Sequence, residues 1–292
     1  MANNFSISIL TTDQLRALTE RLLKEKPESI KRIYVFADLA LGDAEVIKQC
    51  ERIHQALPLT EWILSLPEVL RMQDYAYLRQ CASFLEESTI FSGVLVGNLE
   101  GAGFFQDINE ERVARQKNKF RIYGDHSLYL WNSFAIKTWD GILSGGCLPL
   151  ELRDRDQLDL LKHSFPWEKI TYGRIPMMVT ANCIAKTTNN CLSGKQGKND
   201  ESILGLRDRM GIDFPVRRVC RHCYNVIYNS VPLSLHEEVL RYDASLLLRL
   251  QFTVENEEET SKILRYFLSD QFSQKKPPYQ EFTKGREKKG AL

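Results

Sequence analysis

Short apolar runs rich in β-branched residues alternate with longer amphipathic segments along most of the chain. Short apolar runs of this kind are typical of buried strands, and amphipathic segments between them are typical of helices. The alternation therefore predicts βα units built around a parallel sheet. The predicted strands occupy residues 5–10, 32–37, 61–66, 93–98, 120–125, 147–152, 169–179 and 246–254.

The first predicted helix follows the segment TTDQLRALTERLLKEK, in which Thr11 and Gln14 have the spacing of a capping box. Eight strands with intervening helices indicate an α/β fold, namely a TIM-like (β/α)8 barrel. The pattern leaves open whether the N-terminal region closes this barrel, so an incomplete barrel is the alternative. We assign residues 1–179 and 233–270 to the barrel.

One interval, from Thr180 to Pro232, lacks this alternation and contains four cysteines. A cysteine-rich insertion at residues 180–232, after the seventh strand, would leave the barrel at the face where TIM barrels place their active sites. Residues 271–292 form a basic C-terminal tail, with six Lys or Arg against two Glu. The simplest interpretation of this tail is a solvated segment.

Composition and charge narrow the classes of protein that fit. The net charge of +1 means that any nucleic-acid contact must come from local patches. The chain does not open on a secretory signal pattern, and no apolar run is long enough to span a bilayer, so we expect a cytoplasmic protein without a membrane segment. In a reducing cytosol Cys50, Cys81 and Cys147, which lie in or beside predicted helices and strands, are expected to be core residues.

The remaining cysteines have the spacing of a ligand set. Cys183 and Cys191 are separated by seven residues, and Cys220 and Cys223 by two. Four thiolates from two loops can bind zinc or hold an iron–sulfur cluster. The loose first pair favours a cluster over a zinc ribbon, and unligated core cysteines are the other alternative.

Arginine and tyrosine side chains surround the second cysteine pair. Guanidinium groups and aromatic rings together suit phosphate contacts and base stacking on RNA. Alternatively, Asp208 and Asp213 pair with some of the arginines at the surface. The candidate RNA-binding residues are Arg217, Arg218, Arg221, Tyr224 and Tyr228.

Polar side chains also follow the ends of several predicted strands. Such residues point toward a shared pocket in a barrel, although each alone is more often a helix cap or a loop hydrogen bond. Arg174 is suited to bind an anionic substrate. No serine-hydrolase, metalloprotease or nucleotide-binding motif supports those activities. The candidate catalytic residues are Asn98, Asp125, Glu151, Tyr172 and Arg174.

Three segments together resemble the C-terminal part of peptidase family U thirty-two, the collagenase-like proteases: YGRIPMMVTANCIAKTTNNC, LRDRMGIDFPVRRVCRHCYNVIYNSVPLSL and RLQFTVENEEET. The resemblance extends from about Gly93 to Glu259 and includes GVLVGNLEG, DHSLYLWNS and LPLEL. It implies a TIM-like barrel with a four-iron four-sulfur cluster. The cluster ligands by position would be Cys183, Cys191, Cys220 and Cys223.

The resemblance also implies a function. Several family members act in hydroxylation: of the tRNA wobble uridine with prephenate as a required metabolite, of a 23S rRNA cytidine, and of ubiquinone by a heterodimer. We therefore expect an iron–sulfur protein that assists RNA base hydroxylation, namely formation of 5-hydroxyuridine at the tRNA wobble position, with tRNA or rRNA as its partner. The alternatives are a collagenase-like peptidase and a non-catalytic partner subunit with a structural metal site. A homodimer or heterodimer with another family member, which supplies a missing N-terminal half, is a further expectation.

Overall fold

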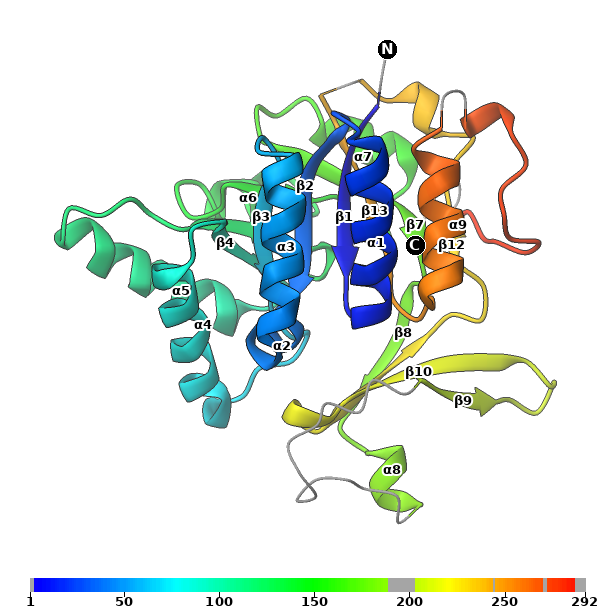
Figure 1. Cartoon of the computed structure of the whole chain (residues 1–292), viewed down its shortest axis with the longest axis horizontal. Coiled ribbons are helices and arrows are strands. Elements are labelled where there is room, and N and C mark those ends of the chain that lie inside the picture. The colour runs from blue at the N-terminus through cyan, green and yellow to red at the C-terminus, as the bar shows by residue number, and fades with distance from the viewer. Residues whose placement is uncertain (1–2, 189–202, 244, 270–271, 287–292) are drawn as a thin grey trace.

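The computed structural model describes residues 3–188, 203–243, 245–269 and 272–286, and these form a closed barrel with a small second sheet (Figure 1). Eight parallel strands in this part of the chain pair in the order β1-β2-β3-β4-β5-β6-β7-β13, and β13 pairs with β1 to close the ring. The predicted TIM-like barrel is confirmed. Its strands are β1 (Asn4–Ile9), β2 (Ile30–Phe36), β3 (Glu61–Ser65), β4 (Phe91–Val96), β5 (Arg121–Gly124), β6 (Gly145–Cys147), β7 (Trp167–Gly173) and β13 (Leu247–Gln251).

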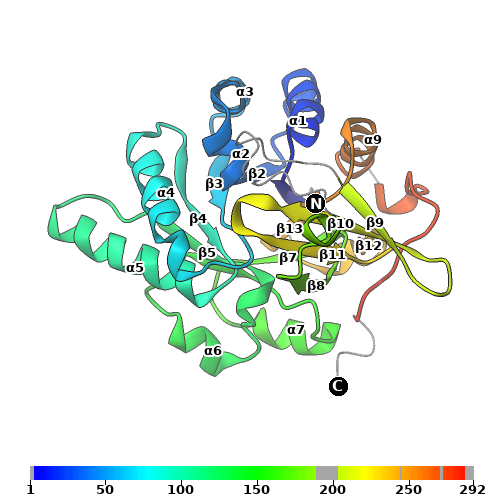
Figure 2. The same ribbon diagram turned by 90° about the horizontal axis from the view of Figure 1, so that it is seen from below.

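Helices surround these strands, as the view from below shows (Figure 2). The longer ones pack against the outer face of the barrel and cover its apolar side chains. They are α1 (Thr12–Glu25), α2 (Ala37–Gly42), α3 (Ala44–Ala56), α4 (Tyr75–Glu87), α5 (Leu99–Ala114), α6 (Ser133–Thr138), α7 (Asp154–Leu160) and α9 (Glu257–Phe267).

Helix α1 begins as its sequence predicts. The Thr11 hydroxyl accepts a hydrogen bond from the Gln14 N–H, and the Gln14 side chain accepts one from the Thr11 N–H, both at 3.3 Å. These two bonds satisfy backbone donors that the first helical turn cannot pair. Leu15, Leu18 and Leu22 then fall on the buried face of the helix. The predicted capping box is confirmed.

The core lies between the strands and the helices. Ile7, Trp62 and Phe105 are among its large, fully buried side chains. Cys50, Cys81 and Cys147 are also completely buried, as predicted. Burial raises the pKa of the Cys50 and Cys81 thiols to about 12, so these groups act as small apolar side chains.

The predicted seventh strand, residues 169–179, is wrong in its extent. The run divides into β7, which belongs to the barrel, and β8 (Pro176–Thr180), which belongs to the second sheet. Gly173 ends β7 with φ +146, and a Cβ there would lie 2.5 Å from the Gln251 carbonyl oxygen. Only glycine fits this close approach, and the chain turns out of the barrel at this point.

The second sheet is antiparallel and has the order β8-β11-β10-β9. It lies beyond the carboxyl ends of the barrel strands (Figure 1). A 3-10 turn, Cys220–His222, links β10 to β11, and the short strand β12 (Leu233–Ser234) returns the chain to β7. The other elements of this region are α8 (Ile184–Thr187), β9 (Ile203–Arg207), β10 (Asp213–Val219) and β11 (Tyr224–Tyr228).

Residues 272–286 of the basic tail pack against the barrel. Phe272 is 5% exposed and contacts Phe5 and Phe267 in the core. The Tyr279 and Ser234 hydroxyls lie 2.6 Å apart. This part of the tail is therefore ordered structure, contrary to the simplest interpretation of its composition. None of the helices in the described ranges is long and apolar enough to cross a membrane.

Candidate functional site

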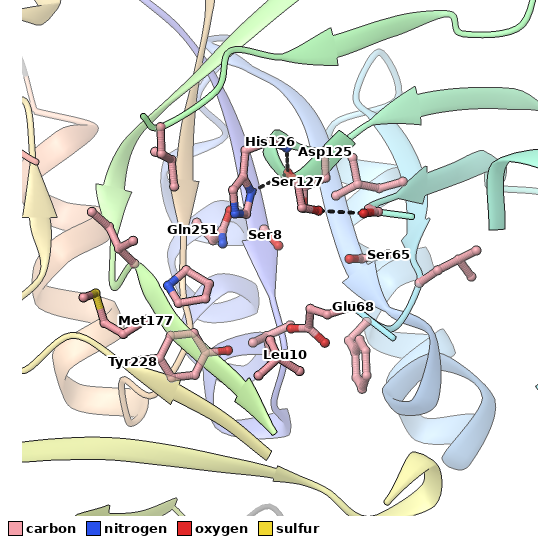
Figure 3. A pocket seen from close by; sticks show the side chains of 18 of the residues that line it. Ser8, Leu10, Ser65, Glu68, Asp125, His126, Ser127, Met177, Tyr228 and Gln251 are labelled. Atoms are coloured by element: carbon pink, nitrogen blue, oxygen red, sulfur yellow. Dashed lines mark hydrogen bonds and ion pairs between the residues drawn. The ribbon is translucent and has the colours of Figure 1, made fainter. Parts of the chain in front are cut away.

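A pocket of about 250 Å³ lies at the mouth of the barrel (Figure 3). Every barrel strand contributes to its wall through the residues at or just beyond its carboxyl end, and the second sheet covers part of it. The polar side chains of the lining are those of Ser8, Ser65, Glu68, Asp125, His126, Ser127, Tyr129, Glu151, Tyr228 and Gln251. We call this cavity the mouth pocket. Such a position is where TIM barrels place their ligands.

Asp125 and His126 follow β5 and form one side of the mouth pocket. Oδ1 of Asp125 accepts hydrogen bonds from the His126 N–H at 2.8 Å and from Nη1 of Arg249 at 2.6 Å. The same oxygen lies 3.1 Å from Nδ1 of His126. Burial raises the pKa of the Asp125 carboxyl, but the charge of Arg249 and the contacts with His126 outweigh burial and hold that pKa well below its usual range. Asp125 is therefore a carboxylate.

Arg249 extends this contact into the barrel interior. Its side chain is completely buried, and its second terminal nitrogen donates to Glu168, which is 2% exposed. Glu168 also accepts hydrogen bonds from the Tyr34 hydroxyl at 2.7 Å and the Ser6 hydroxyl at 2.8 Å. Burial raises the pKa of Glu168, but Arg249 and Arg32 lower it by more. The barrel is thus filled partly by a charged network that fixes Asp125 from below.

Glu68, which follows β3, joins the mouth pocket to the second sheet. Its carboxylate accepts hydrogen bonds from Arg217 on β10 and from the Tyr224 hydroxyl on β11, the latter at 2.7 Å. Arg217 also lies over the Phe36 ring, 4.9 Å from its centroid. Strands β10 and β11 of the second sheet thus both contact the barrel at Glu68.

Glu151, just beyond β6, differs from the other two carboxylates. It lines the mouth pocket, and its Oε2 is buried without a hydrogen-bond partner among the described residues. A buried carboxylate oxygen normally has a donor.

Asn98, Tyr172 and Arg174 do not line the mouth pocket, contrary to the expected shared rim. Asn98 is the N-cap of α5 and accepts a hydrogen bond from the Gly101 N–H at 2.8 Å. The buried Tyr172 donates to Glu255 at 2.9 Å. These residues have structural partners, as polar side chains at strand ends often do.

Arg174 is not placed to bind an anion in the mouth pocket. Its Nη1 donates to the carbonyl oxygens of Asn229, at 3.0 Å, and of Ser230. With Tyr172 it lines a second cavity of about 490 Å³, beside α9 and the segment near Tyr279. The guanidinium group of Arg174 therefore stabilises the turn that follows β11.

Three of the four candidate ligand cysteines lie at one end of the second sheet. Cys220 and Cys223 flank the turn between β10 and β11, and Cys183 follows β8, which pairs with β11. Nδ2 of Asn225 donates to the Asn182 carbonyl oxygen at 3.1 Å, which places Cys183 beside the start of β11. Cys191 lies outside the described residues. Among those that are described, no group of three or more His, Cys, Asp or Glu side chains is placed to bind a metal ion.

The turn itself fits a ligand pair. Cys223 has φ +52, a left-handed conformation that few residues other than glycine and asparagine adopt, and its N–H donates to the Cys220 carbonyl oxygen at 3.3 Å. The geometry keeps both thiols on one tight turn, and the Cys223 side chain is exposed. Thiolates with this spacing are suitable ligands for iron–sulfur clusters and for zinc.

His222 fastens the same turn to the barrel. The side chain is 1% exposed, with Nδ1 2.9 Å from Asp74 and Nε2 3.4 Å from Asp38. Burial lowers the pKa of His222, but the carboxylates of Asp38 and Asp74 outweigh burial and raise it. Arg71 also donates to the His222 carbonyl oxygen at 2.6 Å. The turn that carries two cysteines is therefore held rigidly.

Most of the candidate RNA-binding residues face the protein interior. Arg217, Tyr224 and Tyr228 are 6%, 1% and 1% exposed. An RNA surface composed of these three residues is wrong, because alternation along β10 and β11 directs them toward the barrel. Arg218 is half-buried, and the exposed Arg221 lies over the Tyr77 ring and donates to Gln80.

The alternative interpretation of the arginines holds in part. Arg207 donates to both carboxylate oxygens of Asp213, at 2.8 and 2.7 Å. Asp208 instead accepts from the Met210 and Ile212 N–H groups in the hairpin turn.

Several pocket and network residues were absent from the candidates that sequence predicted. Ser6 and Ser8 on β1 alternate with apolar residues, as do Arg249 and Gln251 on β13. In a closed barrel every second residue of a strand points inward. Polar residues at every second position of an apolar strand therefore identify side chains that point into the barrel. For Glu68 no local pattern gives such a signal.

No protein-family model matches the chain, and no curated protein matches it. Solved structures with a similar fold include a GH18 chitinase from Cycas revoluta, with 12% identity over 91% of this chain and 99% of that chain and a TM-score of 0.43. They also include a putative fructose-1,6-biphosphate aldolase from Coccidioides immitis, with 10% identity over 57% and 64% of the two chains and a TM-score of 0.39. Similarity at this level carries no statement about activity. The chain is a TIM-barrel protein whose mouth is covered in part by an antiparallel sheet.

Proposed function

We propose that this chain is an iron–sulfur protein that assists hydroxylation of an RNA base in the mouth pocket. One observation carries the proposal: the residue that follows the cysteine turn contacts the pocket wall. Tyr224, the residue after Cys223, donates its hydroxyl hydrogen to Glu68, which lines the pocket. A redox centre on that turn would be connected to the pocket through Tyr224 and Glu68.

The residues that would hold the cluster are Cys183, Cys191, Cys220 and Cys223. A four-iron four-sulfur cluster in this place would supply or accept electrons. His222 and Arg71 hold the cysteine turn against the barrel. The position of Cys220 and Cys223 thus depends on the contacts of His222 and Arg71.

The mouth pocket would receive the base. Enzymes that modify a base extrude it from its stack into a fitted pocket and recognise its hydrogen-bonding edge. A cavity of about 250 Å³ with the carboxylate of Glu151 in its wall suits such a group. The tRNA wobble uridine is the first base to examine. A role for prephenate stays a prediction, and Arg174 gives it no support.

Anaerobic purification tests the cluster. We expect a coloured protein with equal amounts of iron and acid-labile sulfide, and a loss of both in Cys220→Ala and Cys223→Ala. Cys50→Ala is the matched control because Cys50 lies in the core, and it should keep its iron. A colourless protein with one zinc ion per chain would contradict the cluster.

Mass spectrometry of nucleosides tests the reaction. Deletion of the gene should remove a hydroxylated nucleoside from tRNA or rRNA, and the wild-type gene should restore it. Unchanged RNA together with loss of gelatin cleavage would favour the peptidase alternative. If the cysteine variants lose stability but every modification persists, the chain is a partner subunit with a structural metal site.

A further inference from the structure

His126 presents an imidazole nitrogen to the mouth pocket. Its side chain is 14% exposed and lies among the lining residues, with its ring in the cavity (Figure 3). Nδ1 lies 3.1 Å from Oδ1 of Asp125, whereas no described residue makes a hydrogen bond to Nε2. The ring therefore has one nitrogen engaged by the protein and one available to a ligand.

The protein fixes this ring from behind. Asp125 accepts hydrogen bonds from both the backbone N–H of His126 and Arg249, and the completely buried Arg249 is held in turn by Glu168. A carboxylate at Nδ1 keeps the proton of the neutral imidazole on that nitrogen. It also stabilises the imidazolium that forms when Nε2 accepts a second proton.

We propose that His126 is a catalytic residue that takes a proton from the ligand in the mouth pocket, and that Asp125 and Arg249 are its positioning residues. This inference rests on the proposed function, because it concerns the reaction in the same pocket. Nε2 accepts the proton of an N–H or O–H group, the bonding pair stays on the ligand, and His126 becomes an imidazolium beside the Asp125 carboxylate. The proton returns to the ligand or leaves to water at the end of the cycle.

The ligand must supply a hydrogen-bond donor, because Nε2 of neutral His126 accepts a hydrogen bond. The site therefore fits a group with an N–H or O–H bond, such as the N3–H of a uracil ring. No Arg or Lys lines the pocket among the described residues, so a dianionic ligand does not match it.

The test compares His126→Gln with His163→Gln in cells that lack the chromosomal gene. Glutamine keeps a donor for Asp125 but cannot transfer a proton, so the hydroxylated nucleoside should fall about 10²-fold to 10⁴-fold. His163 is exposed and lies before β7, at the far end of the barrel, and its variant should retain wild-type levels. Equal iron content and equal melting temperatures show that both variants are folded.

A second measurement separates this inference from the proposed function. Nitrogen NMR of the purified protein should show that the neutral His126 ring carries its proton on Nδ1 and none on Nε2, and Asp125→Asn should change that tautomer. Wild-type product with undiminished product in His126→Gln overturns the inference and leaves the proposed function standing.

If the wild-type protein forms no hydroxylated nucleoside, the proposed function is wrong and the NMR result decides on His126. A bare Nε2 that depends on Asp125 then supports proton transfer from a different ligand in this pocket. A protonated Nε2 overturns it.

Discussion

In the barrel, charged side chains lie inside a closed ring of strands, whereas in the second sheet they lie at the contact between two sheets. Arg249 and Glu168 are 0% and 2% exposed and reach each other from neighbouring strands. Arg217 is similarly buried, but its partner Glu68 is 33% exposed and lies in the loop after barrel strand β3. The same type of ion pair therefore has two different surroundings.

The second sheet is also more exposed to solvent than the barrel. The strands of the barrel are almost fully buried, whereas Met177 and Met178 on β8 are 60% and 57% exposed. The second sheet therefore has little core of its own and depends on a few polar contacts with the barrel. We infer that loss of a barrel contact lowers global stability, whereas loss of a contact in the second sheet releases that sheet locally.

The largest expected effect is that of Arg249→Met. Removing the guanidinium leaves Glu168 and Asp125 without their main counter-charge, and we expect the free energy of unfolding to fall by about 3–5 kcal/mol. Denaturant unfolding measures this change, and Arg241→Met, at an exposed position, is the control. The double variant with Glu168→Gln should lose less than the sum of the single losses. Additive losses would contradict the coupling.

The pH dependence of the free energy of unfolding is a second test of the buried charges in the barrel. Since the folded-state pKa values of Asp125 and Glu168 are lowered, the unfolded chain binds more protons in acid. Their contribution is complete above the unfolded pKa values, about 4, and is lost as the pH falls below them. Urea unfolding from pH 7 toward acid should show this loss in the wild-type protein and a smaller loss in Arg249→Met. Parallel curves for the two proteins would exclude these carboxylates as the source.

Sequence predicted the barrel because its signals are local. Apolar runs placed most strands within a few residues, although the strand predicted at 147–152 overlaps β6 only at Cys147. The Thr11 and Gln14 side chains make the expected capping box. The division of the seventh strand was missed because apolar residues recur on both sides of Gly173 in the run from Lys169 to Val179. Gly173 and Pro176 mark the break between the two strands. Glycine is required at position 173 because the Gln251 backbone, distant in sequence, approaches it closely.

Sequence predicted the site less completely, for a related reason. Asp125, Glu151 and Asn98 all follow barrel strands, but only the first two line the mouth pocket, because Asn98 caps its own helix. Local sequence does not distinguish a cap from a pocket residue. Likewise, arginine is a residue type that often contacts RNA. Only the ion pair of Arg217 with Glu68, which is distant in sequence, shows that Arg217 faces inward.

Glu68→Ala should release the second sheet without unfolding the barrel. The variant leaves the buried Arg217 and Tyr224 without their common partner, and we expect the free energy of local opening to fall by about 1.5–3 kcal/mol. Hydrogen exchange of the β10 and β11 amides measures the opening. Tyr224→Phe removes one of the two contacts and should have the smaller effect. Equal acceleration in β1 and β2 would show instead that both sheets unfold as one unit.

The smallest expected effect is that of Asp213→Asn, at the far edge of the second sheet. Arg207 and Asp213 form a bidentate pair, but their side chains are 69% and 58% exposed, so water solvates both groups when the pair is broken. We expect no measurable change in the melting temperature or in exchange of the β10 amides. Arg207 and Asp213 make two hydrogen bonds, whereas Arg217 donates to Glu68 through one nitrogen, so pairing geometry favours the exposed pair and burial favours the other. A loss at Asp213→Asn equal to that of Glu68→Ala would show that pairing geometry, rather than burial against the barrel, holds the second sheet.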